Sequence, residues 1–189
     1  MIKGYSEKLK GIQTVSKEVI PELVDPFVDR LYKEGMANGR SRDLIFKHAL
    51  RGRIIEIAAW QKLGGQLNES EFNFKDPNSF CWDLESESIK FEIKSTPFEH
   101  KFFSFNLKNN IQDGRIIAVD MSNVVKYPEY VDYVVTGDIV AETESHYEVR
   151  FKHIMNAKNF KNYVRLSKSS NNHFYAHSPA INNGDCVFI

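Results

Sequence analysis

The sequence predicts an α/β fold, or an α+β fold, in which helices come first and a mixed β-sheet follows. Apolar residues recur at the spacing of helices as far as Leu63, and beyond Gly64 and Gly65 they alternate as they do in strands. The chain has 189 residues, of which 42% are hydrophobic and 26% charged, a composition typical of a globular protein. We therefore expect one domain over residues 1–189, with helices flanking a central mixed sheet.

Three segments make up this expected domain. The first forty residues are predicted to be a helical extension, and the last part to hold a short helix and a hairpin that is either a candidate recognition element or a solvated turn. The middle part is expected to be the core that carries the chemistry. The boundaries are 1–40 for the extension, 41–142 for the core and 143–189 for the C-terminal part.

The helical part begins with residues 5–19, where apolar residues fall on one helical face. Pro21 is expected to interrupt this pattern, and Asp25 and Pro26 to start a second helix over Phe27–Glu34. The longest helical pattern follows, with Ser41 as its N-cap and the range Arg42–Leu63 as its body. The paired glycines after Leu63 are typical of a helix end.

The second half of the chain is predicted to be mostly strands. Short alternating or β-branched runs are separated by turn-forming residues such as those at 76–78 and 169–172. A short helix is expected over Ile154–Phe160. The predicted strands are Phe80–Leu84, Ile89–Ser95, Phe102–Leu107, Ile116–Asp120, Tyr133–Val140, Tyr163–Leu166, His173–His177 and Cys186–Ile189.

Charge and composition exclude several classes of protein. The formal net charge is zero, but residues 1–65 and 150–189 are basic and the middle of the chain is acidic. Local basic patches can still bind a polyanion. Two cysteines are too few for a disulfide framework or a four-cysteine zinc site. No apolar run reaches the roughly 18 residues of a membrane span, and Met1–Lys8 lacks the apolar core of a signal peptide, so we expect a cytoplasmic chain with no membrane partner.

The segment around residues 80–95 carries the chemistry. On a strand Glu92 and Lys94 point to the same face, about 7 Å apart. If Asp83 ends the neighbouring strand, its carboxylate lies about 5 Å across from them. Two carboxylates suit a hard cation such as Mg²⁺, and a lysine beside them can orient a water or neutralise charge on a phosphate.

A third acid lies in the long helix among apolar neighbours. Glu56 is costly there unless charge or hydrogen bonds compensate its burial. Arg53 lies three residues before it, and a plain surface pair between these two side chains is an alternative interpretation. Gly52, four residues before Glu56, leaves room for another backbone or a metal to approach.

These residues resemble the PD-(D/E)XK nuclease superfamily over about residues 42–120. The ordered set is a helix Glu56, a strand Asp83 and the strand sequence Glu92-Ile93-Lys94, whereas Trp82 stands where a proline is weakly kept. The resemblance implies a restriction-endonuclease-like core that hydrolyses phosphodiester bonds of DNA with Mg²⁺, or Mn²⁺ in its place. It implies Asp83, Glu92, Glu56 and the carbonyl of Ile93 as metal ligands, and Lys94 as the catalytic lysine.

Basic and amide side chains around this core are candidate contacts to the phosphates of double-stranded or branched DNA. The chain has no glycine-rich phosphate loop, so we expect no nucleotide cofactor. Because one active site cuts one strand, a homodimer is favoured. The candidate contacts are Arg42, Arg51, Arg53, Lys101, Lys108, Arg165, Lys168 and Asn171.

Two other functions stay open at this point. The chain can be a non-catalytic nucleic-acid-binding or assembly protein on a degenerate nuclease core, which is favoured if Asp83, Glu92 and Lys94 do not converge in space or if Mg²⁺ does not bind. It can also be a structure-specific or RNA-directed nuclease, because the metal chemistry is the same. The intact set of acids with its lysine argues against a degenerate core.

Overall fold

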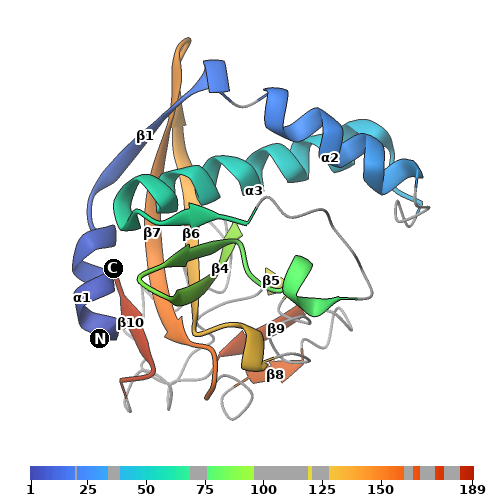
Figure 1. Cartoon of the computed structure of the whole chain (residues 1–189). Coiled ribbons are helices and arrows are strands. Elements are labelled where there is room, and N and C mark those ends of the chain that lie inside the picture. Colours follow the sequence, from blue (N-terminus) through green and yellow to red (C-terminus); the bar gives the residue numbers. More distant parts are fainter. Residues whose placement is uncertain are drawn as a thin grey trace.

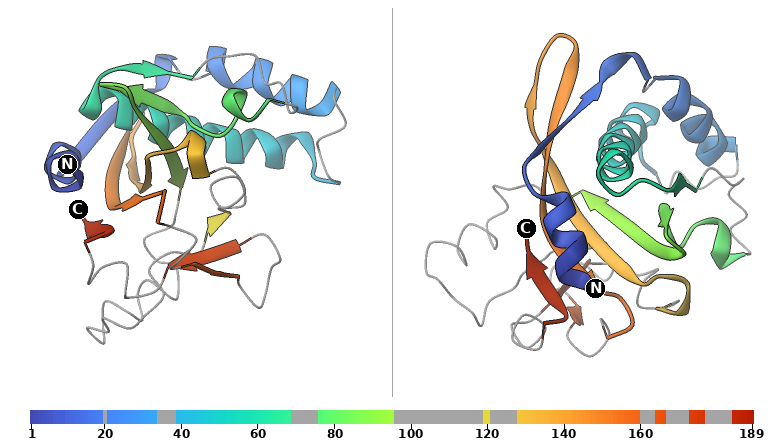
Figure 2. Two further views of the ribbon diagram at one scale, coloured as in Figure 1. Left: turned by 60° about the horizontal axis from the view of Figure 1, so that its bottom comes forward. Right: turned by 60° about the vertical axis from the view of Figure 1, so that its left-hand side comes forward.

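A computed structural model describes residues 1–19, 21–33, 39–68, 76–95, 119–120, 128–159, 164–166, 173–176 and 184–189. Its centre is a curled, mixed, seven-stranded sheet with the strand order β1-β7-β6-β4-β3-β2, in which β10 also pairs with β7. The long helix α3 (Arg42–Leu63) lies in the hollow of the curled sheet, and α2 (Pro21–Lys33) lies beside it (Figures 1 and 2). The predicted mixed sheet with helices is therefore confirmed. None of the described helices is long and apolar enough to cross a membrane.

The N-terminal segment differs from the prediction, because residues 5–19 are not one helix. Helix α1 (Ile2–Leu9) ends before Gly11, whose φ of +81° lies in the left-handed region that favours glycine. Strand β1 (Ile12–Ser16) follows and pairs antiparallel with β7, and a 3₁₀ turn spans Lys17–Val19. The first forty residues are therefore not purely helical, since they supply a strand to the main sheet.

The two longer helices were predicted with unequal success. Helix α2 begins at Pro21, although this proline is expected to interrupt the helical pattern. Proline fits the first turn of a helix, because no backbone donor is needed there. It continues through Pro26 to Lys33. Helix α3 has the predicted bounds: Ser41 Oγ accepts from the Leu44 N–H, and the Gly64 N–H donates to the Trp60 carbonyl.

Strands β3 (Leu84–Ser86) and β4 (Ile89–Ser95) form a tight hairpin. Glu87 and Ser88 both have positive φ, as the two central residues of a type I′ turn require. The predicted strand Phe80–Leu84 is wrong, because a 3₁₀ turn (Pro77–Ser79) and irregular chain lead up to β3. The short β2 (Gln66–Leu67), which was not predicted, completes this edge by pairing with β3.

The longest hairpin joins β6 (Tyr133–Glu142) to β7 (His146–Asn156). Strand β6 runs parallel to β4, and this is the parallel pair of the mixed sheet. The helix expected over Ile154–Phe160 is wrong, because residues up to Asn156 belong to β7. Strand β7 was missed although polar and apolar residues alternate through His146–Phe151, the pattern of a half-buried strand.

Three short strands form a second sheet with the order β5-β9-β8. They are β5 (Val119–Asp120), β8 (Val164–Leu166) and β9 (His173–Ala176). The pairing of β8 with β9 confirms these two predicted strands, and β10 (Cys186–Phe188) confirms the last one. A further 3₁₀ turn spans Pro128–Tyr130, just before β6. The predicted strand Phe102–Leu107 lies outside the described residues.

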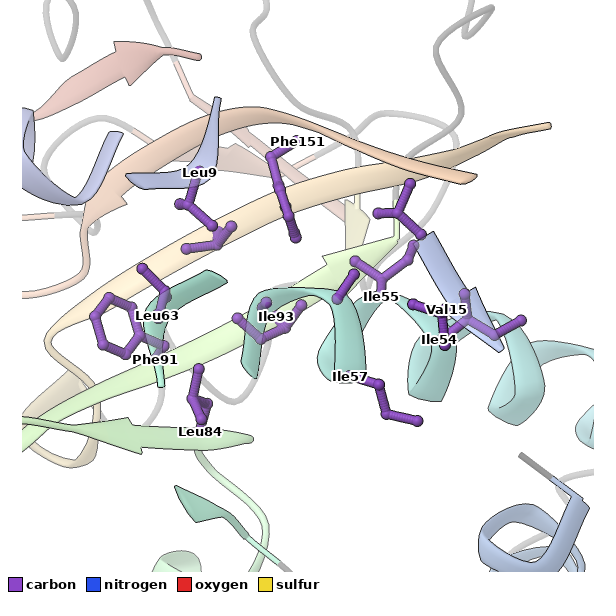
Figure 3. Packing of buried hydrophobic residues seen from close by; sticks show 14 of the residues in the cluster. Leu9, Val15, Ile54, Ile55, Ile57, Leu63, Leu84, Phe91, Ile93 and Phe151 are labelled. Atoms are coloured by element: carbon purple, nitrogen blue, oxygen red, sulfur yellow. The ribbon is translucent and has the colours of Figure 1, made fainter. Parts of the chain in front are cut away.

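The hydrophobic core fills the space between α3 and the sheet (Figure 3). Ile54 and Ile55 of α3 face strands that bring Phe91 and Phe151, and each of these side chains is at most 1% exposed. Truncation of one such aromatic side chain costs about 3–5 kcal/mol of unfolding free energy. The core therefore fixes α3 firmly against β4, and these two elements carry Glu56, Glu92 and Lys94, which are discussed next.

Candidate active site

Strand β4 presents an apolar and a polar series of side chains, as the alternation predicts. Phe91 and Ile93 belong to the core, and Figure 3 shows Ile93 beside α3. Glu92 and Lys94 alternate with them and share the other face of the strand. Glu92 is nevertheless 1% exposed, which is unusual for a carboxylate because its transfer out of water is costly.

Asp83 lies immediately before β3 and is held against β4. Its backbone N–H donates to the Phe91 carbonyl at 2.8 Å, and its Oδ2 accepts from the Ile93 N–H at 2.6 Å. One residue before β3 begins, the Asp83 carboxylate thus takes the place of a backbone acceptor, and it satisfies the Ile93 N–H of β4. The sequence placed Asp83 at a strand end beside Glu92, and it lies there, although at the start of a strand.

Glu92 and Lys94 form an ion pair through Glu92 Oε1 and the Lys94 ammonium. The second oxygen, Glu92 Oε2, is buried and accepts no hydrogen bond from the part of the chain that the structure describes. A buried carboxylate oxygen left in this way costs free energy. A proton shared with the Asp83 side chain, with which Glu92 interacts, or a further cation can compensate this cost.

Glu56 reaches the same place from α3. Its Oε2 accepts from Arg53 Nη1 at 3.0 Å, and the two side chains are only 19% and 16% exposed. The pair is therefore more than a solvated surface contact. Burial raises the pKa of Glu56 to about 7, and the nearby carboxylate of Asp83 adds to this shift. Arg53 and Lys94 oppose it.

The pKa values of the other two acids are also raised, first by burial. For Glu92 the carboxylates of Asp83 and Glu56 add to the effect, and its pKa lies well above the usual value. For Asp83 the ammonium of Lys94 and the hydrogen bond from Ile93 act in the opposite direction. Glu56, Asp83, Glu92 and Lys94 therefore converge into one electrostatically coupled cluster, which we call the acidic cluster.

The donor set of the acidic cluster fits a divalent cation. Three carboxyl groups face two cationic side chains, Arg53 and Lys94, so the fully ionised cluster carries a surplus negative charge in a poorly hydrated place. Carboxylate oxygens are the ligands that Mg²⁺ prefers. Within the described ranges, no group of three or more acidic, histidine or cysteine side chains is already arranged as a metal site. A metal on Glu92 competes with the Lys94 ammonium for the same carboxylate.

No model of a protein family matches the chain, and no curated protein matches it in sequence. The interpretation of the acidic cluster therefore rests on its own geometry and chemistry.

The predicted contacts to nucleic acid are spread over several places. Arg42 is exposed in the first turn of α3 and pairs with Asp29, with Nη2 and Oδ1 2.8 Å apart. Arg53 pairs with Glu56, and Arg51 pairs with Ser95 and Asp138. Arg165 lies in β8. The remaining candidates, Lys101, Lys108, Lys168 and Asn171, lie outside the described residues.

Two residues near the acidic cluster were not singled out from the sequence. Asp138 on β6 is 5% exposed, and Ser95 ends β4 directly after Lys94. In the sequence, Asp138 is an acid within the mostly apolar run of β6, and this could have marked it as a candidate site residue. Its pairing with Arg51 could not be inferred, because that pairing depends on how α3 crosses the sheet.

Proposed function

We propose that the chain is a divalent-metal-dependent endonuclease that hydrolyses phosphodiester bonds of DNA, on a core like that of the PD-(D/E)XK superfamily. The observation that carries the proposal is the convergence of Glu56, Asp83, Glu92 and Lys94. They come from a helix, the loop before β3 and a strand, in the sequence order of the superfamily pattern, although that pattern expects Asp83 on a strand. Scattered surface charges have no reason to gather around a buried carboxylate such as Glu92.

Each side chain has a role in this proposal. Asp83 and Glu92 hold the cation, Glu56 supplies a further carboxylate, and the carbonyl of Ile93 is a further ligand implied by the resemblance. When bound, Mg²⁺ or Mn²⁺ supplies Lewis acidity toward the phosphate and lowers the pKa of a water. The Ile93 N–H keeps the Asp83 carboxylate fixed. The Lys94 ammonium can orient the attacking water or neutralise the charge that develops on the phosphate.

A cleavage assay tests this proposal. Plasmid, linear and branched DNA are incubated with Mg²⁺ or Mn²⁺, beside Asp83→Asn, Lys94→Met and the control Glu85→Gln. Glu85 lies on β3 opposite Lys90, so the control changes a neighbouring acid outside the acidic cluster. We expect metal-dependent cutting that Asp83→Asn and Lys94→Met abolish and Glu85→Gln preserves. Cutting that survives both substitutions overturns the assignment of the site.

The products of that assay also address the remaining parts of the proposal. Nicked circles indicate that one copy cuts one strand, whereas direct linearisation indicates two copies acting together as a homodimer. A preference for branched DNA favours a structure-specific enzyme, and cutting of RNA alone favours an RNA-directed one.

One observation favours a second function. Lys94 already neutralises part of the charge on Glu92, as expected for a nuclease core that binds nucleic acid without cutting it. In that case the folded wild-type protein binds DNA, cleaves no substrate, and its melting temperature does not respond to Mg²⁺ or Mn²⁺.

A further inference from the structure

Arg51 connects three elements at the end of β4 that carries Lys94. It projects from α3, and its Nε donates to Ser95 Oγ at 2.7 Å. Its Nη2 forms an ion pair with Asp138 Oδ1 on β6. Because Ser95 lies opposite Gly137 in the parallel β4–β6 register, the two partners of Arg51 lie at adjacent positions of neighbouring strands.

The same region holds α3 close to β6. A side chain at Gly137 would come within 3.2 Å of Ile55 and 3.0 Å of Phe151, so the helix approaches the strand at a place where only glycine fits without adjustment. Helix α3 and β6 therefore form a firm platform. The Arg51–Ser95 hydrogen bond attaches the last residue of β4 to that platform.

Asp138 is suited to fix Arg51 rather than to bind a ligand. It is 5% exposed, and besides its ion pair with Arg51 its carboxylate interacts with the Lys152 amine. Arg51 itself is 39% exposed along its side chain, so its guanidinium is held on one side by Asp138 and Ser95. The planar guanidinium forms both contacts at once, which a lysine ammonium cannot reproduce with the same geometry.

We propose that Arg51 is a positioning residue: together with Ser95 and Asp138 it fixes the end of β4 and thereby sets where Lys94 stands relative to Glu56 on α3. The proposal rests on the proposed nuclease function for its catalytic consequence. It differs from the sequence prediction, in which Arg51 contacts a DNA phosphate. The two roles make different demands, since a positioning role requires Ser95 and Asp138, and a phosphate contact requires only the charge of Arg51.

Kinetics separate the two roles. We expect Ser95→Ala and Asp138→Asn to lower kcat by about 10- to 100-fold while KM stays within about twofold, because a displacement near 1 Å at a catalytic group has effects of this size. Ser95→Thr keeps the hydroxyl and restores kcat. Glu142→Gln removes the ion pair with Lys17 at the far end of β6 and leaves kcat unchanged. An increase in KM for Arg51→Met, with Ser95→Ala unchanged, overturns the proposal in favour of a phosphate contact.

A second readout needs no nuclease activity. The folded protein is treated with a succinimidyl ester, and acylation of the Lys94 amine is measured by peptide mass spectrometry, with Lys90 of the same strand as the internal reference. We expect acylation of Lys94 relative to Lys90 to rise about 3- to 10-fold in Ser95→Ala and Asp138→Asn, and to stay at the wild-type level in Ser95→Thr and Glu142→Gln. Equal acylation in wild type and Ser95→Ala overturns the positioning role, whether or not the protein cuts DNA.

Discussion

The two polar groups along β4 differ in how their charges are balanced. In the acidic cluster, three carboxyl groups face Arg53 and Lys94, and one buried oxygen of Glu92 accepts no hydrogen bond from the described residues. At the end of the strand, the single carboxylate of Asp138 forms an ion pair with Arg51 and lies near the Lys152 amine, whose pKa burial lowers to about 7. In the first group the carboxylates raise one another's pKa values, whereas in the second group Asp138 opposes the lowering of the Lys152 pKa. We therefore expect the acidic cluster to serve function and the Asp138 group to hold neighbouring elements in place.

The largest expected effect is on catalysis. Glu92→Gln keeps the size and shape of the side chain but removes its charge, and we expect DNA cleavage to fall by at least about 10³-fold because a cation ligand is lost. The same substitution should raise the free energy of unfolding at pH 8, since a neutral amide is cheaper to bury than a carboxylate. Cleavage rates and urea denaturation of the same preparation measure both. If Glu92→Gln lowers the free energy of unfolding and leaves the cleavage rate unchanged, Glu92 serves the fold and not catalysis.

The next effect is a pH dependence that belongs to Glu56. Its pKa is raised from 4.5 to about 7, so the folded state binds more protons than the unfolded state between these values. The stability that protonation of Glu56 gives the folded state is fully present below pH 4.5 and is lost as the pH rises through 7, a change of about 3 kcal/mol. His153, whose pKa is lowered to about 3 by burial, acts in the opposite direction over part of this range.

The comparison of wild type with Glu56→Gln therefore isolates the effect of Glu56. Unfolding free energies are measured by denaturant titration at pH 5.0 and pH 8.0 for both proteins. We expect Glu56→Gln to gain stability relative to wild type at pH 8.0 and to lose that gain at pH 5.0. A difference between the two proteins that does not change with pH shows that Glu56 is ionised in the folded state throughout.

Removal of the charge of Asp138 is expected to lower the free energy of unfolding, whereas removal of the charge of Glu92 is expected to raise it. Asp138→Asn removes the anion that faces Arg51 and Lys152, and we expect the free energy of unfolding to fall by about 1–3 kcal/mol, because Arg51 loses its ion-pair partner and the Lys152 amine loses the anion that favours its charged form. Arg51 is partly exposed, which keeps the loss below that of a fully buried pair. In a double-mutant cycle, Arg51→Met should cost less in the Asp138→Asn background than in wild type. Additive losses contradict the coupling.

The difference between local and long-range interactions explains what the sequence could predict. Periodicity and caps are local, so α3 and β4 were predicted with their observed bounds, and the order Glu56, Asp83, Glu92, Lys94 was enough to place the acidic cluster. Residues 5–19 failed because a 3.6-residue pattern was followed across Gly11, where the chain turns from α1 into β1. The burial of Glu92 and the Arg51–Ser95 bond depend on the crossing of α3 over the sheet, which no local pattern contains.

The smallest expected effect tests whether the surplus charge of the acidic cluster is there for a cation. A ligand that binds only the folded state stabilises it by RT ln(1 + [L]/Kd), which is about 1.4 kcal/mol for Mg²⁺ at ten times its Kd. We therefore expect Mg²⁺ or Mn²⁺ to raise the melting temperature of wild type by a few degrees. The Asp83→Asn/Glu92→Gln double variant should start higher and not respond, whereas Asp138→Asn should start lower and respond like wild type. An equal response of all three proteins means that the cation binds elsewhere, and the imbalance of charge beside β4 then needs another occupant.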